Sequence, residues 1–341
     1  MKKYLLWHEG ALGDLLLTRL AVAALKIGLC GELFLCARNE ARFLFKEAGL
    51  VQYVASTERG PCFWLDYLRP EAVFVFGGPR LLALFKGQTP VYGIETRPRG
   101  ETHLALQMLA QVQDLLGLKG VAEKAVAQGL CLGKGAQPSG PLWIHPGSGG
   151  RFKCAPPAWT KALATHLEAQ GLSLEVILGP AEKDLRDLFS GPKQGTFLPR
   201  DLAEAQRRLS KGRGFVGFDS GLSHLAASLG LPTVAIFGPT PWRYWAPFGP
   251  QVLVLVQRCS CLLQGKDPRA CEDPCLGHLP PDQVAQWVSE FINTTAKNPG
   301  MAPGPEGLEK SFSVVQWSVG PAPSAKFVPL CLRPAEAGEE G

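Results

Sequence analysis

Short apolar runs alternate along the chain with segments whose apolar residues recur at helical spacing. The apolar runs predict strands, which we expect at 1–8, 31–37, 72–76, 91–94, 142–145 and 174–178. The helical spacing predicts helices, which we expect at 15–27, 42–48, 102–116, 157–170, 181–189, 202–210 and 281–292. Strands and helices in turn, at these lengths, are typical of a doubly wound parallel sheet, so we predict an α/β fold.

A Gly- and Pro-rich stretch at 133–141, GKGAQPSGP, interrupts this alternation once. We therefore predict two Rossmann-like domains, 1–135 and 140–295, that face a cleft at the carboxyl ends of their strands. From residue 297 onward, prolines and glycines break the pattern. We expect this tail, 297–341, to be mostly disordered, with an apolar patch at 312–317 that offers a contact with the body of the protein.

Composition narrows the class of protein. Of the 341 residues, 46% are hydrophobic, which is usual for a globular protein. No apolar run approaches the ~20 residues of a membrane span. The apolar patch at 4–7 is too short for a signal peptide, so we expect a cytoplasmic protein. A formal net charge of +5 is too small to indicate nucleic acid as a partner.

Residues 215–250 carry the most specific pattern, an apolar strand, a turn of small polar residues, a helix and a second apolar strand. The turn reads Asp219-Ser220-Gly221-Leu222-Ser223-His224. Glycine and serine let the backbone approach a ligand, and the N–H groups at a helix start favour an anion, so we predict a phosphate site here. The turn lacks the G-x-S-x-G of a hydrolase. A helix cap for Asp219 and a core position for His224 are the alternative roles.

Two other glycine-rich loops follow predicted strands. One is Gly10-Ala11-Leu12-Gly13-Asp14, and the other runs from His145 to Lys153 with the sequence HPGSGGRFK. In the second loop the lysine supplies a positive charge, and the backbone N–H groups can form a nest for a diphosphate. Neither loop has the dinucleotide or P-loop spacing, which disfavours a nicotinamide oxidoreductase. Asp14 is either a helix cap or a carboxylate that faces the cleft.

The ten cysteines come without a secretory signal, which argues against a disulfide scaffold. Four of them lie within 17 residues: Cys259, Cys261, Cys271 and Cys275. Their spacing, C-x-C…C-x3-C, departs from the paired C-x2-C of zinc sites. Free thiols are favoured, with a structural zinc or a disulfide left open. We expect the chemistry to need neither a metal nor a cofactor.

Two arginines, Arg97 and Arg99, come directly after the predicted strand 91–94. On the cleft side they are placed to bind acceptor phosphates in bidentate fashion. Exposed arginines without a function are common, so a plain surface position is the alternative for both residues.

Together these motifs make the chain similar to the heptosyltransferase family, glycosyltransferase family 9. Four segments carry the resemblance, in the family's order: GALGDLLLTRLAVAALK, IHPGSGGRFK, LGPAEKD and FVGFDSGLSHLAASLGLPTVAIFGPT. It spans residues 4–293 and implies a GT-B fold. It also implies transfer of a heptose, with inversion, from ADP-heptose to a lipopolysaccharide inner-core acceptor on lipid A. The enzyme would then work as a peripheral protein at the inner face of the cytoplasmic membrane.

The resemblance implies roles for individual residues. Asp14 matches the family's catalytic base and Glu182 its ribose-binding acid. Donor diphosphate contacts are implied for Ser148, Gly149, Lys153, Ser220 and Gly221, and further donor contacts for Asp219, Leu222 and His224. Cys154-Ala155 departs from the basic and aromatic pair usual after the lysine, which leaves the exact sugar and acceptor open.

Transfer from a nucleoside diphosphate sugar needs a stabilised leaving group and a base for the acceptor hydroxyl. We predict that the second half of the chain holds the diphosphate and that Asp14 takes the proton. Two alternatives stay open, a sugar-nucleotide epimerase on the same fold and a non-catalytic nucleotide-binding protein.

Overall fold

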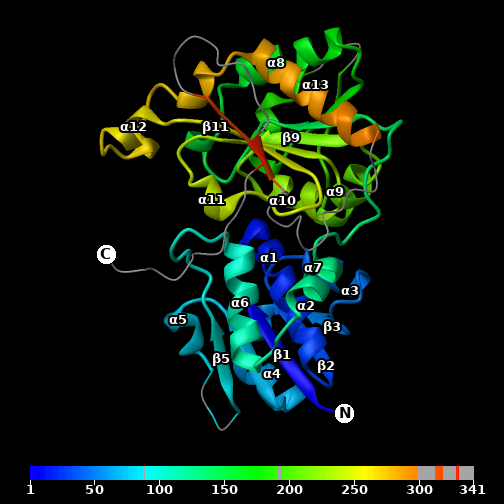
Figure 1. Cartoon of the computed structure of the whole chain (residues 1–341), viewed down its shortest axis with the longest axis vertical. Coiled ribbons are helices and arrows are strands. Elements are labelled where there is room, and N and C mark those ends of the chain that lie inside the picture. The colour runs from blue at the N-terminus through cyan, green and yellow to red at the C-terminus, as the bar shows by residue number, and fades with distance from the viewer. Residues whose placement is uncertain (86, 88, 190–193, 298–311, 318–327, 330–341) are drawn as a thin grey trace. The chain divides into compact units, whose positions relative to one another are not determined.

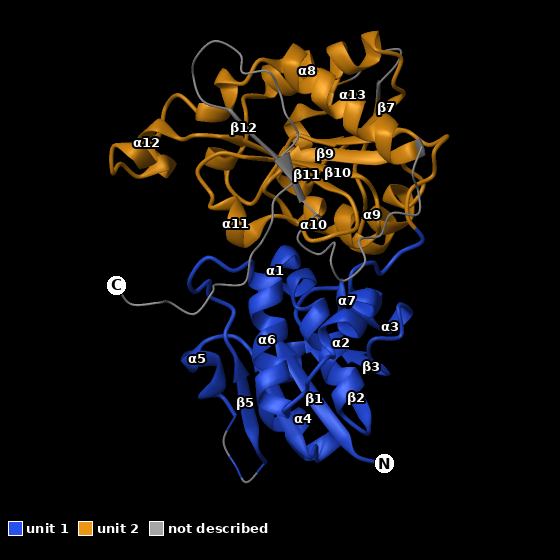
Figure 2. Cartoon of the chain, in the orientation of Figure 1, with its two compact units in different colours: residues 1–134 blue, residues 135–341 orange. Residues whose placement is uncertain are grey.

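The structure, a computed structural model, describes residues 1–85, 87, 89–189, 194–297, 312–317 and 328–329. It divides the chain into two compact units, residues 1–134 and 135–341 (Figures 1 and 2). Each unit is built on its own β-sheet.

Unit 1 (1–134) contains a five-stranded parallel sheet in the order β3-β2-β1-β4-β5. Its strands are β1 (Lys3–His8), β2 (Glu32–Ala37), β3 (Tyr53–Ala55), β4 (Ala72–Phe76) and β5 (Val91–Ile94). The central strand β1 pairs with β2 and β4, and all five residues of β4 are buried. A parallel sheet covered on both faces needs such continuous apolar strands.

The helices of unit 1 are α1 (Leu12–Leu17), α2 (Arg19–Gly28), α3 (Arg42–Glu47), α4 (Gly60–Leu68), α5 (Pro79–Leu82), α6 (Leu104–Leu116) and α7 (Ala122–Gly129). Of these, α2 packs against both α6 and α7. Sequence patterns predicted neither α4 nor α7, because α4 is apolar along most of its length and α7 is short, so neither shows a long periodic stripe.

The helix predicted over 15–27 is two helices in the structure, with the break at Thr18. The backbone N–H and the hydroxyl of Thr18 both donate to the Leu15 carbonyl oxygen, at 3.0 and 2.8 Å. Threonine competes in this way with regular helical bonding and closes α1 after one tight turn. Because α1 begins at Leu12, it includes Asp14 in its first turn.

Unit 2 (135–341) contains an eight-stranded sheet in the order β13-β12-β11-β10-β9-β6-β7-β8. Its strands are β6 (Leu142–His145), β7 (Leu174–Ile177), β8 (Gln194–Phe197), β9 (Gly214–Phe218), β10 (Thr233–Phe237), β11 (Val252–Gln257), β12 (Phe312–Trp317) and β13 (Val328–Pro329). All pairings except that of β12 with β13 are parallel.

The α-helices of unit 2 are α8 (Pro157–Ala169), α9 (Leu202–Leu209), α10 (Gly221–Ser228), α11 (Trp242–Trp245), α12 (Ser260–Leu263) and α13 (Pro281–Lys297). One core joins the inner face of α8 and α13 to strands β6, β7, β9, β10 and β11. The indole N–H of Trp159 in α8 donates to the Leu279 carbonyl oxygen at 2.6 Å and ties α8 to the segment before α13.

The helix predicted over 181–189 is wrong. The chain instead forms two 3-10 turns, Pro180–Leu185 and Asp187–Phe189. Their bonds span three residues, as from the Arg186 N–H to the Lys183 carbonyl oxygen at 3.2 Å. The Glu182 carboxylate turns back to accept the Gly179 N–H at 2.9 Å and so shapes the first turn.

The described part of the tail adds strands to the sheet. β12 lies beside β11 in parallel register, so the segment 312–317 does contact the body of unit 2. The disorder predicted for the remainder of 297–341 concerns segments that, apart from β13 and Lys297, lie outside the described residues.

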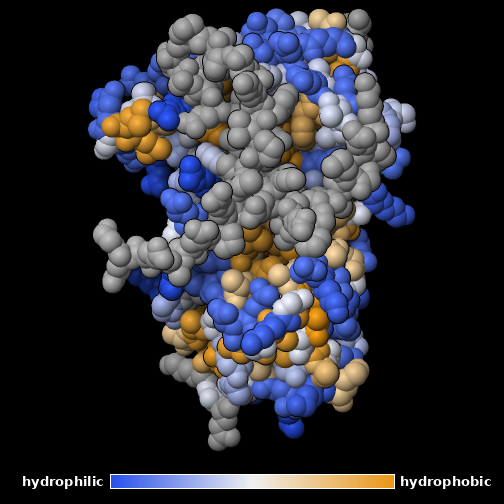
Figure 3. All heavy atoms as spheres, in the orientation of Figure 1, coloured by the Kyte–Doolittle hydropathy of each residue, from blue (hydrophilic) through white to orange (hydrophobic). Residues whose placement is uncertain are grey.

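An apolar patch of the surface lies on a short helix of unit 2. Figure 3 shows an apolar patch at the position that α12 occupies in Figure 1. There Leu262 and Leu263 are 47% and 74% exposed. Within the described residues, no helix combines the length and apolar character that crossing a membrane requires.

Candidate functional site

The loops that follow β6, β7 and β9 gather most of the predicted donor residues in unit 2. These three strands are parallel and adjacent, in the order β9-β6-β7. Their carboxyl ends therefore lie at one edge of the sheet, which is where open α/β sheets bind ligands. The loops are 146–153, 178–185 and 219–220.

The turn after β9 opens helix α10 with a serine cap. The Ser220 hydroxyl accepts the Ser223 N–H at 3.3 Å, and the Ser223 hydroxyl donates to the Phe218 carbonyl oxygen at 2.6 Å. These bonds fix the first turn of an eight-residue helix, whose N-terminal N–H groups favour an anion. Gly221 and Leu222, the first two helical residues, are half-buried.

An ion pair connects the loop after β6 to this turn. The Lys153 ammonium lies 2.8 Å from the Asp219 carboxylate, with the two side chains 28% and 10% exposed. The Ser148 hydroxyl donates to the main-chain oxygen of Asp219. Three residues predicted for the donor site are therefore in direct contact, although up to 71 positions separate them in the chain.

The acid predicted for the ribose, Glu182, lies over two glycines of neighbouring loops. Its carboxylate accepts the Gly179 N–H, and its carboxyl group occupies the space that a side chain on Gly147 would need. Beneath it, the Nδ1–H of His145 donates to the Ile177 carbonyl oxygen at 2.9 Å. Burial lowers the pKa of His145, while that bond and the charge of Glu182 oppose the shift.

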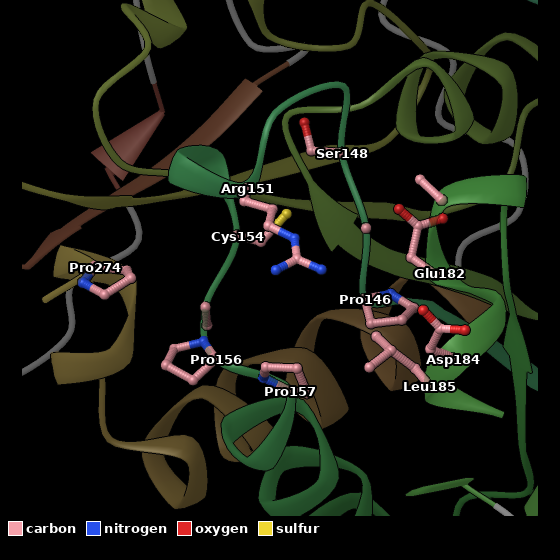
Figure 4. A pocket seen from close by; sticks show the side chains of 13 residues that line it. Pro146, Ser148, Arg151, Cys154, Pro156, Pro157, Glu182, Asp184, Leu185 and Pro274 are labelled. Carbon is pink, nitrogen blue, oxygen red and sulfur yellow. The ribbon is translucent and has the colours of Figure 1, made fainter. Parts of the chain in front are cut away.

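A cavity of about 310 Å³ opens beside these groups (Figure 4). Figure 4 shows Arg151 on one side of it and Glu182 and Leu185 on the other. Ser148, Cys154 and Pro274 also line it. Of the lining residues, Ser148 and Glu182 were predicted individually, and Gly147 and Arg151 belong to the loop predicted to surround the diphosphate. The signal for the others is their position, since Arg151 and Cys154 sit in the same loop as Lys153.

Two residues predicted to bind the donor, Gly149 and His224, are not among the residues that line the cavity. Gly149 is exposed, and no described atom lies within 4 Å of the place where its side chain would be. His224 is buried, 4% exposed, within α10. Its position agrees with the core alternative that the sequence left open.

Unit 1 presents Asp14 at the carboxyl end of its central strand. The Asp14 carboxylate accepts the Ala11 N–H at 3.0 Å and so caps α1 from inside the helix. Gly10 lies between His8 and Asp14. A β-carbon on Gly10 would lie 2.8 Å from Cε1 of His8 and 2.9 Å from Cβ of Asp14, so only glycine fits without displacing one of them.

The sequence patterns did not single out His8. It ends β1, is 2% exposed, and its Nδ1 has no hydrogen-bond partner in the described part of the chain. Burial lowers its pKa to about 4, which keeps the ring neutral at physiological pH.

The predicted acceptor arginines lie after β5. Arg99 is 74% exposed in its side chain and forms a 3.4 Å ion pair with Glu95. Arg97 is exposed, and its N–H donates to the same carboxylate at 3.1 Å. Glu95 thus balances part of the positive charge that the sequence prediction relied on.

The cysteine cluster occupies the segment between β11 and α13. The described cysteines are free thiols. Among the described residues, no group of three or more His, Cys, Asp or Glu side chains is arranged to hold a metal ion. Burial and the neighbouring Cys259 raise the pKa of Cys275 to about 12, so this thiol stays protonated.

Comparison with known proteins places these findings in context. The family model described as glycosyltransferase family 9 (heptosyltransferase) matches residues 105–271. Lipopolysaccharide heptosyltransferase 1 of Pseudomonas aeruginosa is 35% identical over 97 residues, which span 28% of this chain and 27% of that protein. The chain thus aligns with only about a quarter of that curated relative.

Two solved structures resemble the chain over most of its length. A family 9 glycosyltransferase from Veillonella parvula superposes with a TM-score of 0.68 and 16% identity, over 86% of this chain and 98% of that one. The heptosyltransferase WaaC of E. coli, solved with ADP, superposes with a TM-score of 0.63 and 18% identity, over 85% of this chain and 99% of that one. These likenesses confirm the predicted fold class, GT-B, with its two parallel-sheet α/β domains.

Proposed function

We propose that the chain belongs to glycosyltransferase family 9, the heptosyltransferase family, and that it transfers a heptose from ADP-heptose to a lipopolysaccharide core acceptor. The reaction joins an acceptor hydroxyl oxygen to C1 of the sugar and releases ADP. The acceptor is of the lipid A-core type, so the enzyme works as a peripheral protein at the cytoplasmic face of the membrane.

One observation carries the proposal. Lys153 and Ser148 both contact Asp219, directly before the N-terminus of α10, and a nucleoside-sized cavity lies beside them. A lysine, a hydroxyl and main-chain N–H groups are the donors that a diphosphate requires. The same groups stabilise the negative charge that develops on the leaving ADP.

The nucleoside of the donor occupies the 310 Å³ cavity in this proposal. Glu182 lines it with a carboxylate fixed by the Gly179 N–H, which suits it to accept hydrogen bonds from ribose hydroxyls. A relative in the same family has been solved with ADP, which supports adenine as the base.

Asp14 acts as the general base. It takes the proton of the acceptor hydroxyl while that oxygen attacks C1 and the C1–O bond to the diphosphate breaks. A single displacement of this kind inverts the configuration at C1 and forms no covalent sugar–enzyme intermediate. Asp14 suits the role because the Ala11 N–H orients its carboxylate at the start of α1.

Two substitutions of Asp14 test the base. Asp14→Asn keeps an oxygen to accept the Ala11 N–H but cannot take a proton, and Asp14→Ala removes both functions. We expect both to lower turnover of ADP-heptose with a truncated core acceptor by about 10²- to 10⁴-fold. Product is measured by mass spectrometry of the glycolipid. ADP affinity should not change, and an Asn variant with near-normal turnover would remove Asp14 from this role.

Lys153→Met tests the diphosphate site separately. Methionine fills the space of the lysine stem without its charge, so we expect ADP to bind at least tenfold more weakly by calorimetry. Adenosine, which lacks phosphates, should bind both proteins equally. Equal ADP affinity in the two proteins contradicts the assignment of Lys153.

Incubation of the donor without acceptor separates transfer from the epimerase alternative, which needs no acceptor.

A further inference from the structure

The ammonium proposed to bind the donor diphosphate already has a partner inside the protein. Lys153 lies 2.8 Å from the Asp219 carboxylate. The carboxylate side of the pair is only 10% exposed, so water screens this attraction less than it screens a surface ion pair.

Asp219 holds a second group of the same site through a different atom. Its main-chain oxygen accepts the Ser148 hydroxyl, and its neighbour Ser220 caps α10. Substitution of the Asp219 side chain therefore removes the contact with Lys153 and leaves the main-chain acceptor for Ser148 in place.

A diphosphate bound at Lys153 would compete with the Asp219 carboxylate for the same ammonium. An anion that reaches Lys153 at this edge of the sheet also comes close to the negative charge of Asp219, and two anions at short range repel each other. Binding the donor must then weaken or share the Lys153–Asp219 pair, and the pair re-forms as ADP leaves.

We propose that Asp219 is an internal counter-ion that holds Lys153 in place in the free enzyme and competes with the diphosphate for it. This inference rests on the proposed function, because it takes Lys153 as a diphosphate ligand. Asp219 acts through Lys153 and so is a positioning residue, with two effects. It keeps the lysine oriented before the donor arrives, and it limits the lifetime of the ADP complex.

A competing carboxylate and a carboxylate that binds the donor directly have opposite effects on ADP affinity when the carboxylate is removed. If the carboxylate of Asp219 bound the donor, its loss would weaken binding. If it competes with the donor, its loss strengthens the binding of ADP. Asp219→Asn keeps the size of the side chain and removes its charge, which makes it the test variant.

We expect Asp219→Asn to bind ADP about 3- to 30-fold more tightly than the wild-type protein by calorimetry, the range for a partly buried ion pair. Most of the gain should be a slower dissociation of ADP in stopped-flow displacement. Adenosine affinity should stay the same. Asp219→Ser, a smaller neutral variant, serves in the same assay if the Asn protein does not fold.

Two controls make the result specific. Asp187→Asn neutralises an exposed carboxylate of the same region that does not line the cavity and takes part in none of the described ion pairs, so it should change ADP affinity far less. In a Lys153→Met background, Asp219→Asn should change ADP affinity by a different factor than in the wild-type background, since without the lysine only the repulsion between the carboxylate and the diphosphate remains.

Unchanged or weaker ADP binding by both neutral variants overturns the inference. So does an equal gain from Asp187→Asn, which would indicate a general charge effect. The proposed function fails on a different measurement, namely unchanged ADP affinity in the single variant Lys153→Met. The two failures can therefore be told apart in one set of titrations.

Discussion

The first strand of each unit ends in a histidine, His8 in unit 1 and His145 in unit 2, and the surroundings of the two rings differ. His145 donates its Nδ1–H to the Ile177 carbonyl oxygen, whereas Nδ1 of His8 has no partner in the described part of the chain. Burial lowers the pKa of both. A buried ring without a partner is a site where protonation costs the folded state the most.

The pKa of His8, about 4 in the folded protein against 6.5 for a free histidine, makes stability depend on pH. Above pH 6.5 the ring is neutral in both states. As the pH falls from 6.5 to 4, only the unfolded chain takes up the proton, so the free energy of unfolding falls by up to about 3 kcal/mol.

His8→Gln, which cannot titrate in this range, isolates the effect. Urea unfolding at several pH values between 7 and 4 should show the wild-type protein losing stability faster than the variant. His145 contributes a slope in both proteins and cancels in the comparison. If the free energy of unfolding falls equally with pH in both proteins, His8 does not titrate in this way.

At the scale of single elements, the apolar runs of the sequence predicted strands best. The observed bounds of β4, β5 and β6 coincide with the predicted ones, because each is a short apolar run set off by Gly, Pro or polar residues. The run VLVLVQ of β11 carries an equally plain signal that the prediction left out.

Elements shaped by a single side chain could not be predicted from periodicity. Thr18 splits one apolar stripe into two helices, and Glu182 draws the segment after β7 into a 3-10 turn. Within the site, the sequence indicated the residue types and their loops. The Lys153–Asp219 contact spans 66 positions, so only the strand order brings it about.

The bond between α8 and the segment before α13 gives a test at this scale. Trp159→Phe keeps a ring in the core but leaves the Leu279 carbonyl oxygen without its donor. We expect a loss of about 1–2 kcal/mol in the free energy of unfolding by urea titration, since an unpaired buried acceptor costs that much.

Trp143 provides the matched control. Its ring is also buried, and its indole N–H has no hydrogen-bond partner in the described part of the chain. Trp143→Phe breaks no described bond, so it should cost less than Trp159→Phe. The reverse order would show that ring volume, and not the hydrogen bond, sets the stability of this core.

At the scale of the whole molecule, every proposed donor contact lies in unit 2. Ser148, Lys153, Glu182, Asp219 and Ser220 all belong to residues 135–341, which have their own sheet and core. We therefore expect a fragment of residues 135–341 to bind ADP within about threefold of the full chain by calorimetry, as rigid contacts confined to one unit imply.

Residues 1–134, made as a separate fragment, are the control and should not bind ADP. Neither fragment alone should transfer sugar, because the proposed base Asp14 lies in unit 1. A folded 135–341 fragment without ADP affinity would place an essential donor contact in unit 1.

The glycine between His8 and Asp14 has a consequence for how the protein tolerates variation. Every other amino acid at this position must push aside either an imidazole or the β-carbon of an aspartate. A survey of all replacements along the chain would therefore score position 10 as harshly as the proposed base itself. That intolerance would reflect lack of room, because glycine has no side chain to contribute to any chemistry.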